Sequence, residues 1–348
     1  MFRQANAAQL AGDWAEAERR YRALVELKPS WAFHNLGVVY MATGRLEEAE
    51  AAFRAALGAD PAQAATRHSL SMLLLGEGRY AEAWPLYEAR REVAGLKINH
   101  PKLPYPEWRG EDLAGRRLLV VTEQGLGDQI QYARFLPGLV ARGAQVTFAC
   151  APSLAPVFAG LGVTLAPVTE GFALPEADEW TLMMSLPLRL GLTLDEVSGA
   201  PYLAPAPQRA GGGVGVVARG AASHSNDRFR SLDPRSAAEV LALGRDLTPE
   251  ATGARDFLET ARIVADLDLV ISVDTSVAHL AGAMGKPVWI LLPAVETDWR
   301  WLRGRDDSPW YGSARLYRQT QPGDWGPVVR QVEADLAALG LPQSRPGP

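Results

Sequence analysis

The chain has 348 residues, of which 47% are hydrophobic and 22% are charged, as in a folded globular protein of more than one domain. Its formal net charge of −5 offers no basic surface for nucleic acid, so no nucleic-acid partner is expected. The single cysteine, Cys150, excludes an internal disulfide and is typical of a reducing compartment. The sequence contains no apolar run of the roughly 20 residues that span a membrane and no apolar signal region, so we expect a cytoplasmic protein without an integral membrane segment.

The first 96 residues carry a repeated pattern. The triplets GDW, GRL and GRY begin at Gly12, Gly44 and Gly78, which are 32 and 34 residues apart, a spacing typical of stacked helical repeats. The middle copy, FHNLGVVYMATGRLEEAEAAFRAALGADP at 33–61, resembles the tetratricopeptide repeat at nearly every signature position. After each glycine, a small residue and then an aromatic ring recur at fixed distances: Ala17, Ala49 and Ala83, then Tyr21, Phe53 and Tyr87.

The resemblance implies a helical array at 1–96. Small residues let the two helices of a repeat approach closely, and about three copies are needed to bury a shared core. Such an array has a concave surface that would hold a protein or peptide partner. A short array that only packs against the next domain is the alternative interpretation.

Residues 97–115 are predicted to be a linker, because three prolines disfavour a helix there, with Trp108 as an anchor. From residue 116 onward, apolar strands alternate with helical segments, which indicates parallel sheets. A first α/β domain is expected at 116–205, with strands at 118–122, 145–150, 163–166 and 179–184 and helices at 128–142 and 154–161.

A hinge rich in proline and glycine at 203–213 precedes a second α/β domain, expected at 206–340, and a short tail at 341–348. Two α/β domains joined by a hinge form a cleft, and ligands of open parallel sheets lie at the carboxyl ends of the strands. In the second domain we expect strands at 214–218, 267–273 and 288–292 and helices at 236–243, 257–266, 275–284 and 328–339.

The stretch EQGLGDQI at 123–130 follows the first predicted strand. Gly125 and Gly127 allow the backbone to turn sharply and to approach a substrate closely. Asp128, at the start of the next helix, is either a helix N-cap or a catalytic carboxylate. The stretch is not a dinucleotide-binding fingerprint, since Ile130 occupies the third glycine position, and it lacks the Gly-Lys of a P-loop.

The strongest chemical signal is DLVISVDTSVAHLAGAMGKP at 268–287, a predicted strand that runs into a helix. Thr275, Ser276 and Val277 open this helix, and unpaired N–H groups at a helix start bind anions. Ser276 and His279 are three residues apart and therefore share one helix face. A capped core helix with a buried histidine is the alternative.

Together, GLGD at 125–128, VDTSVAHLAGA at 273–283, WRWL at 299–302 and SPWY at 308–311 resemble bacterial tetratricopeptide proteins with a glycosyltransferase family 9-like, heptosyltransferase-like region. The resemblance implies an α + α/β architecture, in which a tetratricopeptide array precedes a GT-B fold of two Rossmann-like domains. The first domain would hold the acceptor and the second a nucleotide sugar. The four tryptophans between 298 and 325 would then either stack on sugars or belong to the core.

The resemblance also implies roles for individual residues. Asp128 would be the general base, and Gly125 and Gly127 beside it would contact the nucleotide sugar. The nucleotide sugar would be held by Asp274, by the amides of Thr275, Ser276 and Val277, by His279, and by Arg228 or Arg230 in the segment 223–231. A diphosphate leaving group stabilised by these groups needs neither a metal nor a further cofactor, and the reaction would invert the anomeric centre.

One departure from the family pattern leaves a second function open. The segment 244–255 is expected to be too short for the usual strand and loop, so part of the nucleotide pocket would be missing. A scaffold that binds proteins through the repeats and has lost transferase activity is the alternative. A dinucleotide-dependent oxidoreductase is disfavoured, because the glycine fingerprint is absent.

Overall fold

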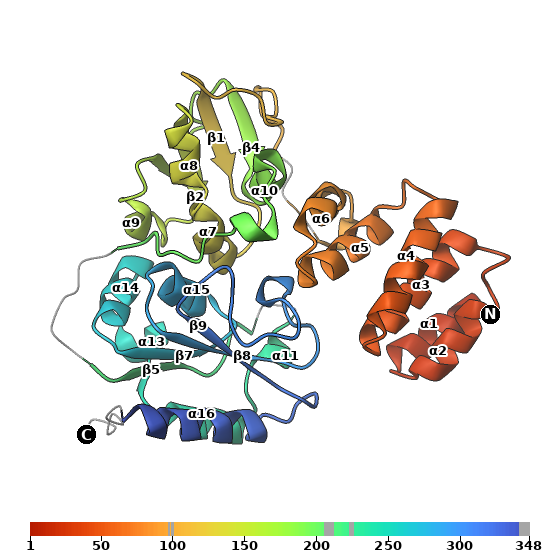
Figure 1. Ribbon diagram of the computed structural model, residues 1–348. Coiled ribbons are helices and arrows are strands. Elements are labelled where there is room, and N and C mark those ends of the chain that lie inside the picture. The colour runs from red at the N-terminus through yellow and green to blue at the C-terminus, as the bar shows by residue number, and fades with distance from the viewer. Residues whose placement is uncertain (97, 99–100, 205–211, 223–225, 341–348) are drawn as a thin grey trace. The chain divides into compact units, whose positions relative to one another are not determined.

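The computed structural model describes the chain except for a few short segments, and within it two compact units are distinguished (Figure 1). The first unit is Met1–His100 together with Gly191–Asp195, and the second is Pro101–Leu190 together with Glu196–Pro348. The predicted tail, most of the predicted hinge and the first part of the segment 223–231 lie outside the described residues, which exclude 97, 99–100, 205–211, 223–225 and 341–348.

The first unit is built from helices that follow one another in antiparallel pairs (Figure 1). Gly44 and Gly78, with φ of 74° and 78°, end the first helix of their pairs in the left-handed conformation that glycine favours. A Cβ atom at Gly37 would lie 2.5 Å from the Phe53 ring, so glycine permits the close approach within the middle pair. The helices are α1 (Phe2–Leu10), α2 (Trp14–Arg22), α3 (Pro29–Ala42), α4 (Leu46–Ala59), α5 (Ala64–Gly76) and α6 (Tyr80–Tyr87), then the 3₁₀ turns η1 (Glu88–Arg91) and η2 (Ala94–Leu96).

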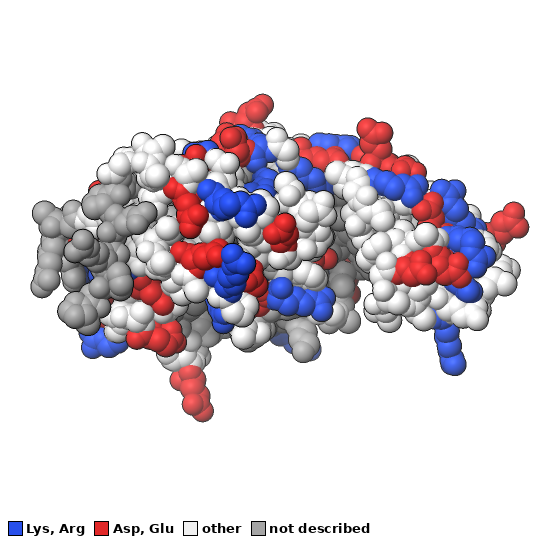
Figure 2. Space-filling view, turned by 90° about the horizontal axis from the view of Figure 1, so that it is seen from below, with Lys and Arg blue, Asp and Glu red and all other residues white. Residues whose placement is uncertain are grey.

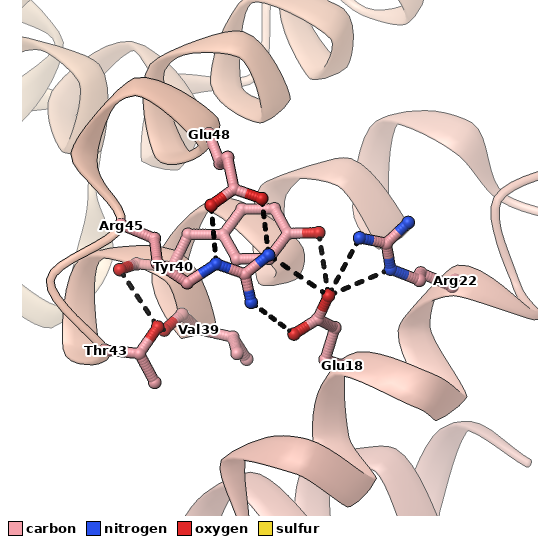
Figure 3. Close-up of polar contacts among 7 residues, drawn as sticks. All are labelled: Glu18, Arg22, Val39, Tyr40, Thr43, Arg45 and Glu48. Atoms are coloured by element: carbon pink, nitrogen blue, oxygen red, sulfur yellow. Dashed lines mark hydrogen bonds and ion pairs between the residues drawn. The ribbon is translucent and has the colours of Figure 1, made fainter.

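A ladder of ion pairs links successive helical pairs. Arg45 Nη1 lies 2.6 Å from Glu18 of the preceding pair, and Arg45 also binds Glu48 at the start of its own helix (Figure 3). Arg79 repeats this arrangement in the next pair, with Glu50 at 2.8 Å and Glu82 at 2.6 Å. Each partly exposed pair contributes only ~0.2–1 kcal/mol to the stability of the stack.

The last helical pair is covered by a segment from far along the sequence. The Trp84 indole Nε1 donates a hydrogen bond of 2.8 Å to the Leu192 carbonyl oxygen. The Leu194 side chain lies against Gly78, where a Cβ atom would come within 2.6 Å of it. Gly191–Asp195 therefore belongs to the helical unit and buries the end of the stack.

The first α/β domain contains a parallel sheet whose described strands have the order β3-β2-β1-β4. Before it, the main-chain N–H of the fully buried Trp108 donates to the Trp180 carbonyl oxygen, so the segment around Trp108 lies against the sheet edge. The strands are β1 (Arg117–Val121), β2 (Gln145–Cys150), β3 (Thr164–Pro167) and β4 (Glu179–Leu182), and the helices are α7 (Leu126–Ala133), α8 (Leu136–Ala141), α9 (Ala155–Phe158) and α10 (Leu186–Leu190), with the 3₁₀ turns η3 (Met183–Ser185) and η4 (Leu194–Glu196).

The helix predicted at 128–142 is instead two helices, α7 and α8, and this part of the prediction is wrong. Pro137 has no N–H to continue the hydrogen-bond ladder of α7, and it stands in the first turn of α8. The break ends α7 after two turns and leaves Arg134 at its carboxyl end.

The second α/β domain contains a larger parallel sheet with the order β6-β5-β7-β8-β9. Its strand β9 was not predicted, and neither was β6. The segment 244–255, which was expected to be too short for the usual strand and loop, contains a strand of two residues and a helix of four. The strands are β5 (Val214–Val217), β6 (Arg245–Asp246), β7 (Leu269–Val273), β8 (Val288–Leu292) and β9 (Ala314–Arg318), and the helices are α11 (Asp227–Arg230), α12 (Pro234–Leu241), α13 (Pro249–Thr252), α14 (Phe257–Ala265), α15 (Ser276–Ala283) and α16 (Gly326–Leu339), with the 3₁₀ turn η5 (Trp299–Trp301).

Alternate residues of β7 point to opposite faces of this sheet. Leu269, Ile271 and Val273 pack into a core that also contains side chains of α12 and α16. Helices α14 and α15 lie on the side of the sheet that faces the first α/β domain (Figure 1). This arrangement brings the carboxyl end of β7 and the start of α15 close to α7.

The surface has no continuous basic region on the face drawn in Figure 2, where acidic and basic side chains are interspersed. Among the helices that the structure describes, none combines the length and the apolar character needed to span a membrane.

Candidate active site

Asp128 lies in the first turn of α7 and does not cap it. The N-cap residue is Gly125, and no side chain caps this helix end, so the N-cap interpretation of Asp128 is wrong. Instead, the Asp128 carboxylate forms an ion pair with the guanidinium of Arg300 in η5. The pair joins the two α/β domains, and both side chains are largely buried, 15% of Asp128 and 7% of Arg300 being exposed.

A second carboxylate fixes Arg300 from its own loop. Asp298 precedes η5, and its Oδ1 accepts a hydrogen bond of 3.0 Å from the Arg300 main-chain N–H. Its Oδ2 accepts a second one, of 2.6 Å, from Arg300 Nη1. Asp298 thus holds both the main chain and the guanidinium of Arg300, and Asp128 binds the same guanidinium from the other domain.

Asp274 follows β7 and is the third carboxylate near this arginine. Burial, together with the charge of Asp298, raises the pKa of Asp274 to about 6, although Trp301, Arg300 and Arg230 act in the opposite direction. Arg230 Nη1 also donates a hydrogen bond of 2.8 Å to the Asp274 carbonyl oxygen. Two arginines, Arg230 and Arg300, therefore lie near the carboxyl end of β7.

His279 lies on α15 between aromatic rings of its own domain. Its Nδ1 is 2.9 Å from the Tyr311 hydroxyl, and its ring stacks on Trp301 at a centroid distance of 5.3 Å. Its Nε2 is 3.7 Å from Asp274. Burial, together with the positive charges of Arg300, Arg134 and Arg230, holds the pKa of His279 well below its ordinary value, so the imidazole is neutral at pH 7.

The two predicted glycines differ in what they require. A Cβ atom at Gly127 would lie 2.8 Å from His279 Cδ2, so residue 127 has no room for a side chain where α7 meets α15. Gly125 has φ of −65°, which any residue adopts, and a Cβ atom there would lie 3.4 Å from Asp128 Oδ2. Only Gly127 is dictated by close packing.

The start of α15 has the features expected of an anion site. Thr275 is the N-cap residue, and its hydroxyl lies 3.0 Å from that of Ser272, so the helix has no side-chain cap. Ser276 and Val277, the first helical residues, are partly exposed. Of the two candidate arginines, Arg230 reaches this region through Asp274, whereas Arg228 is exposed and lies over the Phe229 ring.

Arg134 was missed by the sequence reasoning. Its guanidinium is 4.9 Å from the Tyr202 ring, 5.1 Å from the Trp310 ring and 4.9 Å from the Tyr311 ring. Since Arg134 belongs to the first α/β domain and the SPWY motif to the second, this cation–π cluster ties the domains together. The sequence singled out the SPWY motif at 308–311, but nothing in it indicated that Arg134 would be the partner of these rings.

The four tryptophans between 298 and 325, namely Trp299, Trp301, Trp310 and Trp325, are all buried, with at most 5% of any of them exposed. Their burial favours the interpretation that they belong to the core.

The described residues contain no group of three or more His, Cys, Asp or Glu side chains that could hold a metal ion. Independence of metal remains a prediction.

The helical unit belongs to a known class. Residues 2–64 and 34–94 match the family model for the tetratricopeptide repeat, which confirms the predicted repeats. The protein thus consists of tetratricopeptide repeats followed by two α/β domains with parallel sheets, as predicted.

Among curated proteins, the chain is similar to Protein FlbA of Caulobacter vibrioides, with 27% identity over 370 aligned residues that cover 88% of the chain. The chain spans 61% of the length of that relative.

Three solved structures are also similar. A glycosyl transferase of family 9 from Veillonella parvula has 12% identity and a TM-score of 0.39, covering 65% of this chain and 91% of its own. TibC, described as an iron-containing dodecameric glycosyltransferase from enterotoxigenic E. coli, has 15% identity and a TM-score of 0.39, with coverages of 66% and 78%. A mutant O-GlcNAc transferase from Thermobaculum terrenum has 14% identity and a TM-score of 0.26, with coverages of 97% and 92%. At this level of similarity, function has to be argued from the residues of the chain itself.

Proposed function

We propose that the protein transfers a sugar from a nucleotide-diphosphate sugar to a hydroxyl group of a protein or saccharide acceptor. The observation that carries the proposal is the meeting of Asp128 with Arg300. Asp128 follows β1 of one parallel sheet, and Arg300 follows β8 of the other. The carboxyl ends of both sheets thus contribute ionisable groups to one place, which is where open parallel sheets bind ligands.

In the proposed reaction, the acceptor oxygen attacks the anomeric carbon of the donor from the side opposite the diphosphate. The bond between that carbon and the diphosphate oxygen breaks, and its electron pair leaves with the nucleoside diphosphate. The hydroxyl proton passes to the Asp128 carboxylate. Attack from the opposite side inverts the anomeric centre, and a positioned base of this kind contributes ~10²–10⁴-fold in rate.

The donor diphosphate would be bound at the start of α15. The main-chain N–H groups of Thr275, Ser276 and Val277 supply donors at the positive end of a helix dipole, and Arg230 adds charge beside them. His279 is neutral and largely buried, so its role in the proposal is to hold α15 against Gly127. Arginine and amide donors neutralise a departing diphosphate without a metal ion.

The tetratricopeptide array would recruit the acceptor protein or another partner through its concave surface. The buried thiol of Cys150, whose pKa burial raises to about 11, suits the reducing compartment of the proposed cytoplasmic location.

One observation favours a second function, a protein-binding scaffold whose transferase domain is inactive. Strand β6, at the edge of the donor-side sheet, has two residues, and the helix after it, α13, has four. A nucleotide pocket formed at this edge of the sheet would therefore have fewer residues to line it. In that case the repeats would still bind a partner, but no sugar would be transferred.

Thermal melting against UDP-, GDP- and ADP-sugars tests the donor site. A ligand present at about 100 times its dissociation constant raises the stability by about 2.7 kcal/mol. We expect one nucleotide class to raise the melting temperature, and Ser276→Pro to remove that shift. Release of the nucleoside diphosphate in the presence of an acceptor then distinguishes a transferase from a scaffold. No shift with any donor would contradict the proposal.

A further inference from the structure

Arg300 is held by carboxylates from both α/β domains, and the two carboxylates hold it differently. Asp298 is its neighbour in the chain and binds both its main-chain N–H and its Nη1. Asp128 is 172 residues away and binds Nη2. The contact with Asp298 is local to one loop and does not depend on the other domain. The contact with Asp128 depends on the position of α7, and another anion that binds Arg300 would compete with it.

The ion pair affects the chemistry proposed for Asp128. An arginine beside a carboxylate favours its charged form and weakens its hold on a proton. A general base has to accept a proton as the acceptor oxygen attacks, so an Asp128 still paired with Arg300 is a poorer base than a released one. Release has a cost, because Arg300 is 5% exposed and a buried charge without a partner is unfavourable.

The same site offers a replacement for Asp128. The ring of Trp301, the residue after Arg300, stacks on His279 of α15. A Cβ atom at Gly127, the residue before Asp128, would lie 3.6 Å from the Cα atom of Ser276 at the start of the same helix. The proposed anion-binding start of α15 is therefore close to the Asp128–Arg300 pair. The planar guanidinium group binds phosphate oxygens in a bidentate manner, as it binds a carboxylate. A diphosphate at the start of α15 would keep Arg300 paired when Asp128 leaves it.

We propose that Arg300 is shared between Asp128 and the donor diphosphate, so that arrival of the diphosphate releases Asp128 to act as the base. This inference rests on the proposed transferase function. In the empty site Asp128 is restrained, and it becomes a competent base only when the donor is bound. After transfer, Asp128 loses the accepted proton to solvent and the nucleoside diphosphate leaves. Arg300 then pairs again with the Asp128 carboxylate, which resets the site.

The test is a comparison of nucleoside diphosphate affinities, measured by calorimetry with UDP, GDP and ADP. Asp128→Asn removes the competing charge with little change in shape, so the diphosphate that the wild type binds should bind roughly tenfold more tightly, within the usual range of coupling between two sites. In an Arg300→Gln background the same Asp128→Asn change should give no gain, because the shared group is gone.

The matched control is Asp307→Asn. Asp307, like Asp128, pairs with an arginine, in this case Arg305, but 63% of the Asp307 side chain is exposed. Its substitution should leave diphosphate affinity unchanged. If Asp128→Asn does not fold, Arg300→Lys is the second variant. It keeps the charge but loses the planar fork, and it should bind the diphosphate more weakly than the wild type.

The outcomes separate the inference from the proposed function. If the wild type binds a nucleoside diphosphate and Asp128→Asn binds it equally or more weakly, sharing of Arg300 is overturned while the donor site stands. Unchanged binding in Arg300→Lys would overturn it too. If the wild type binds none of the three nucleotides at millimolar concentration, the proposed transferase function fails, and the inference fails with it.

Discussion

Gly127 and His279 lie in direct contact where the two α/β domains meet. A methyl group on residue 127 would come within 2.8 Å of His279 Cδ2, although the two residues belong to helices of different α/β domains. The imidazole has little freedom to move away, because it stacks on Trp301 and bonds to Tyr311. The fit between α7 and α15 thus depends on the absence of a side chain at residue 127.

Gly127→Ala should therefore lower the free energy of unfolding by ~1–3 kcal/mol, the usual cost of forcing a methyl group into a packed interface. Gly125→Ala is the control, because its φ of −65° suits alanine and the nearest atom would be 3.4 Å away. Chemical denaturation followed by tryptophan fluorescence measures both variants. Equal stabilities would show that the domains do not pack through this contact.

The role proposed for Asp128 predicts the effect of removing its charge. Asp128→Asn keeps the shape of the side chain, so the fold should persist while sugar transfer falls by ~10²–10⁴-fold. Transfer is measured as release of the nucleoside diphosphate in the presence of an acceptor. Asp307→Asn, which removes a largely exposed carboxylate from the same α/β unit, should retain full activity. Normal turnover in Asp128→Asn would rule out the base.

Asp274 predicts a pH dependence of stability. Its pKa is raised from 3.8 to about 6 in the folded protein, so the folded state holds this proton more tightly than the unfolded chain does. The contribution of Asp274 is therefore favourable at low pH and is lost as the pH rises from about 4 to 6. With 1.36 kcal/mol for each pKa unit, the loss is about 2–3 kcal/mol.

Asp274→Asn isolates this contribution from those of other groups. The variant should unfold at higher denaturant concentration than the wild type at pH 7.5, and this advantage should shrink as the pH is lowered toward 4. Denaturant titrations at several pH values measure the difference. A difference that does not change with pH would mean that Asp274 titrates normally.

The segment Gly191–Asp195 is predicted to stabilise the repeat array. Leu192 is 8% exposed, and its carbonyl oxygen accepts the bond from Trp84. Leu192→Ala should lower the stability of the helical unit by ~2–5 kcal/mol, as expected for a buried leucine. Leu10→Ala in the same unit changes a side chain that is 88% exposed and should stay within about 0.5 kcal/mol. Thermal melting followed by circular dichroism compares the stabilities of the two variants. Equal losses of stability would contradict the stabilising role of Gly191–Asp195.

A chelator tests the predicted independence of metal. The carboxylates Asp128 and Asp298 are both engaged by Arg300, and the leaving diphosphate would be neutralised by arginine and amide donors. Sugar transfer measured with excess EDTA should therefore match transfer without it. Loss of activity that added magnesium restores would show that a metal takes part.

Local patterns in the sequence were sufficient to predict the repeats and most of the strands. The glycines, small residues and rings of the array recur at fixed spacings, because each repeat packs mainly on its neighbours. Strand β9 was overlooked because ARLYR at 314–318 includes two arginines and lacks the apolar run of β5, β7 or β8. Its place in the sheet comes from pairing with β8.

The amino-acid sequence by itself thus determined the repeat array, the alternation of strands and helices, and the two motifs that carry Asp128 and His279. Tertiary structure alone decided that Asp128 pairs with Arg300, that Arg134 lies among three rings, and that Gly191–Asp195 covers the last repeat. The physical reason is distance along the chain. Helix starts, turns and repeats depend on interactions among nearby residues, whereas ion pairs and aromatic contacts between residues far apart in the sequence exist only in the folded tertiary structure.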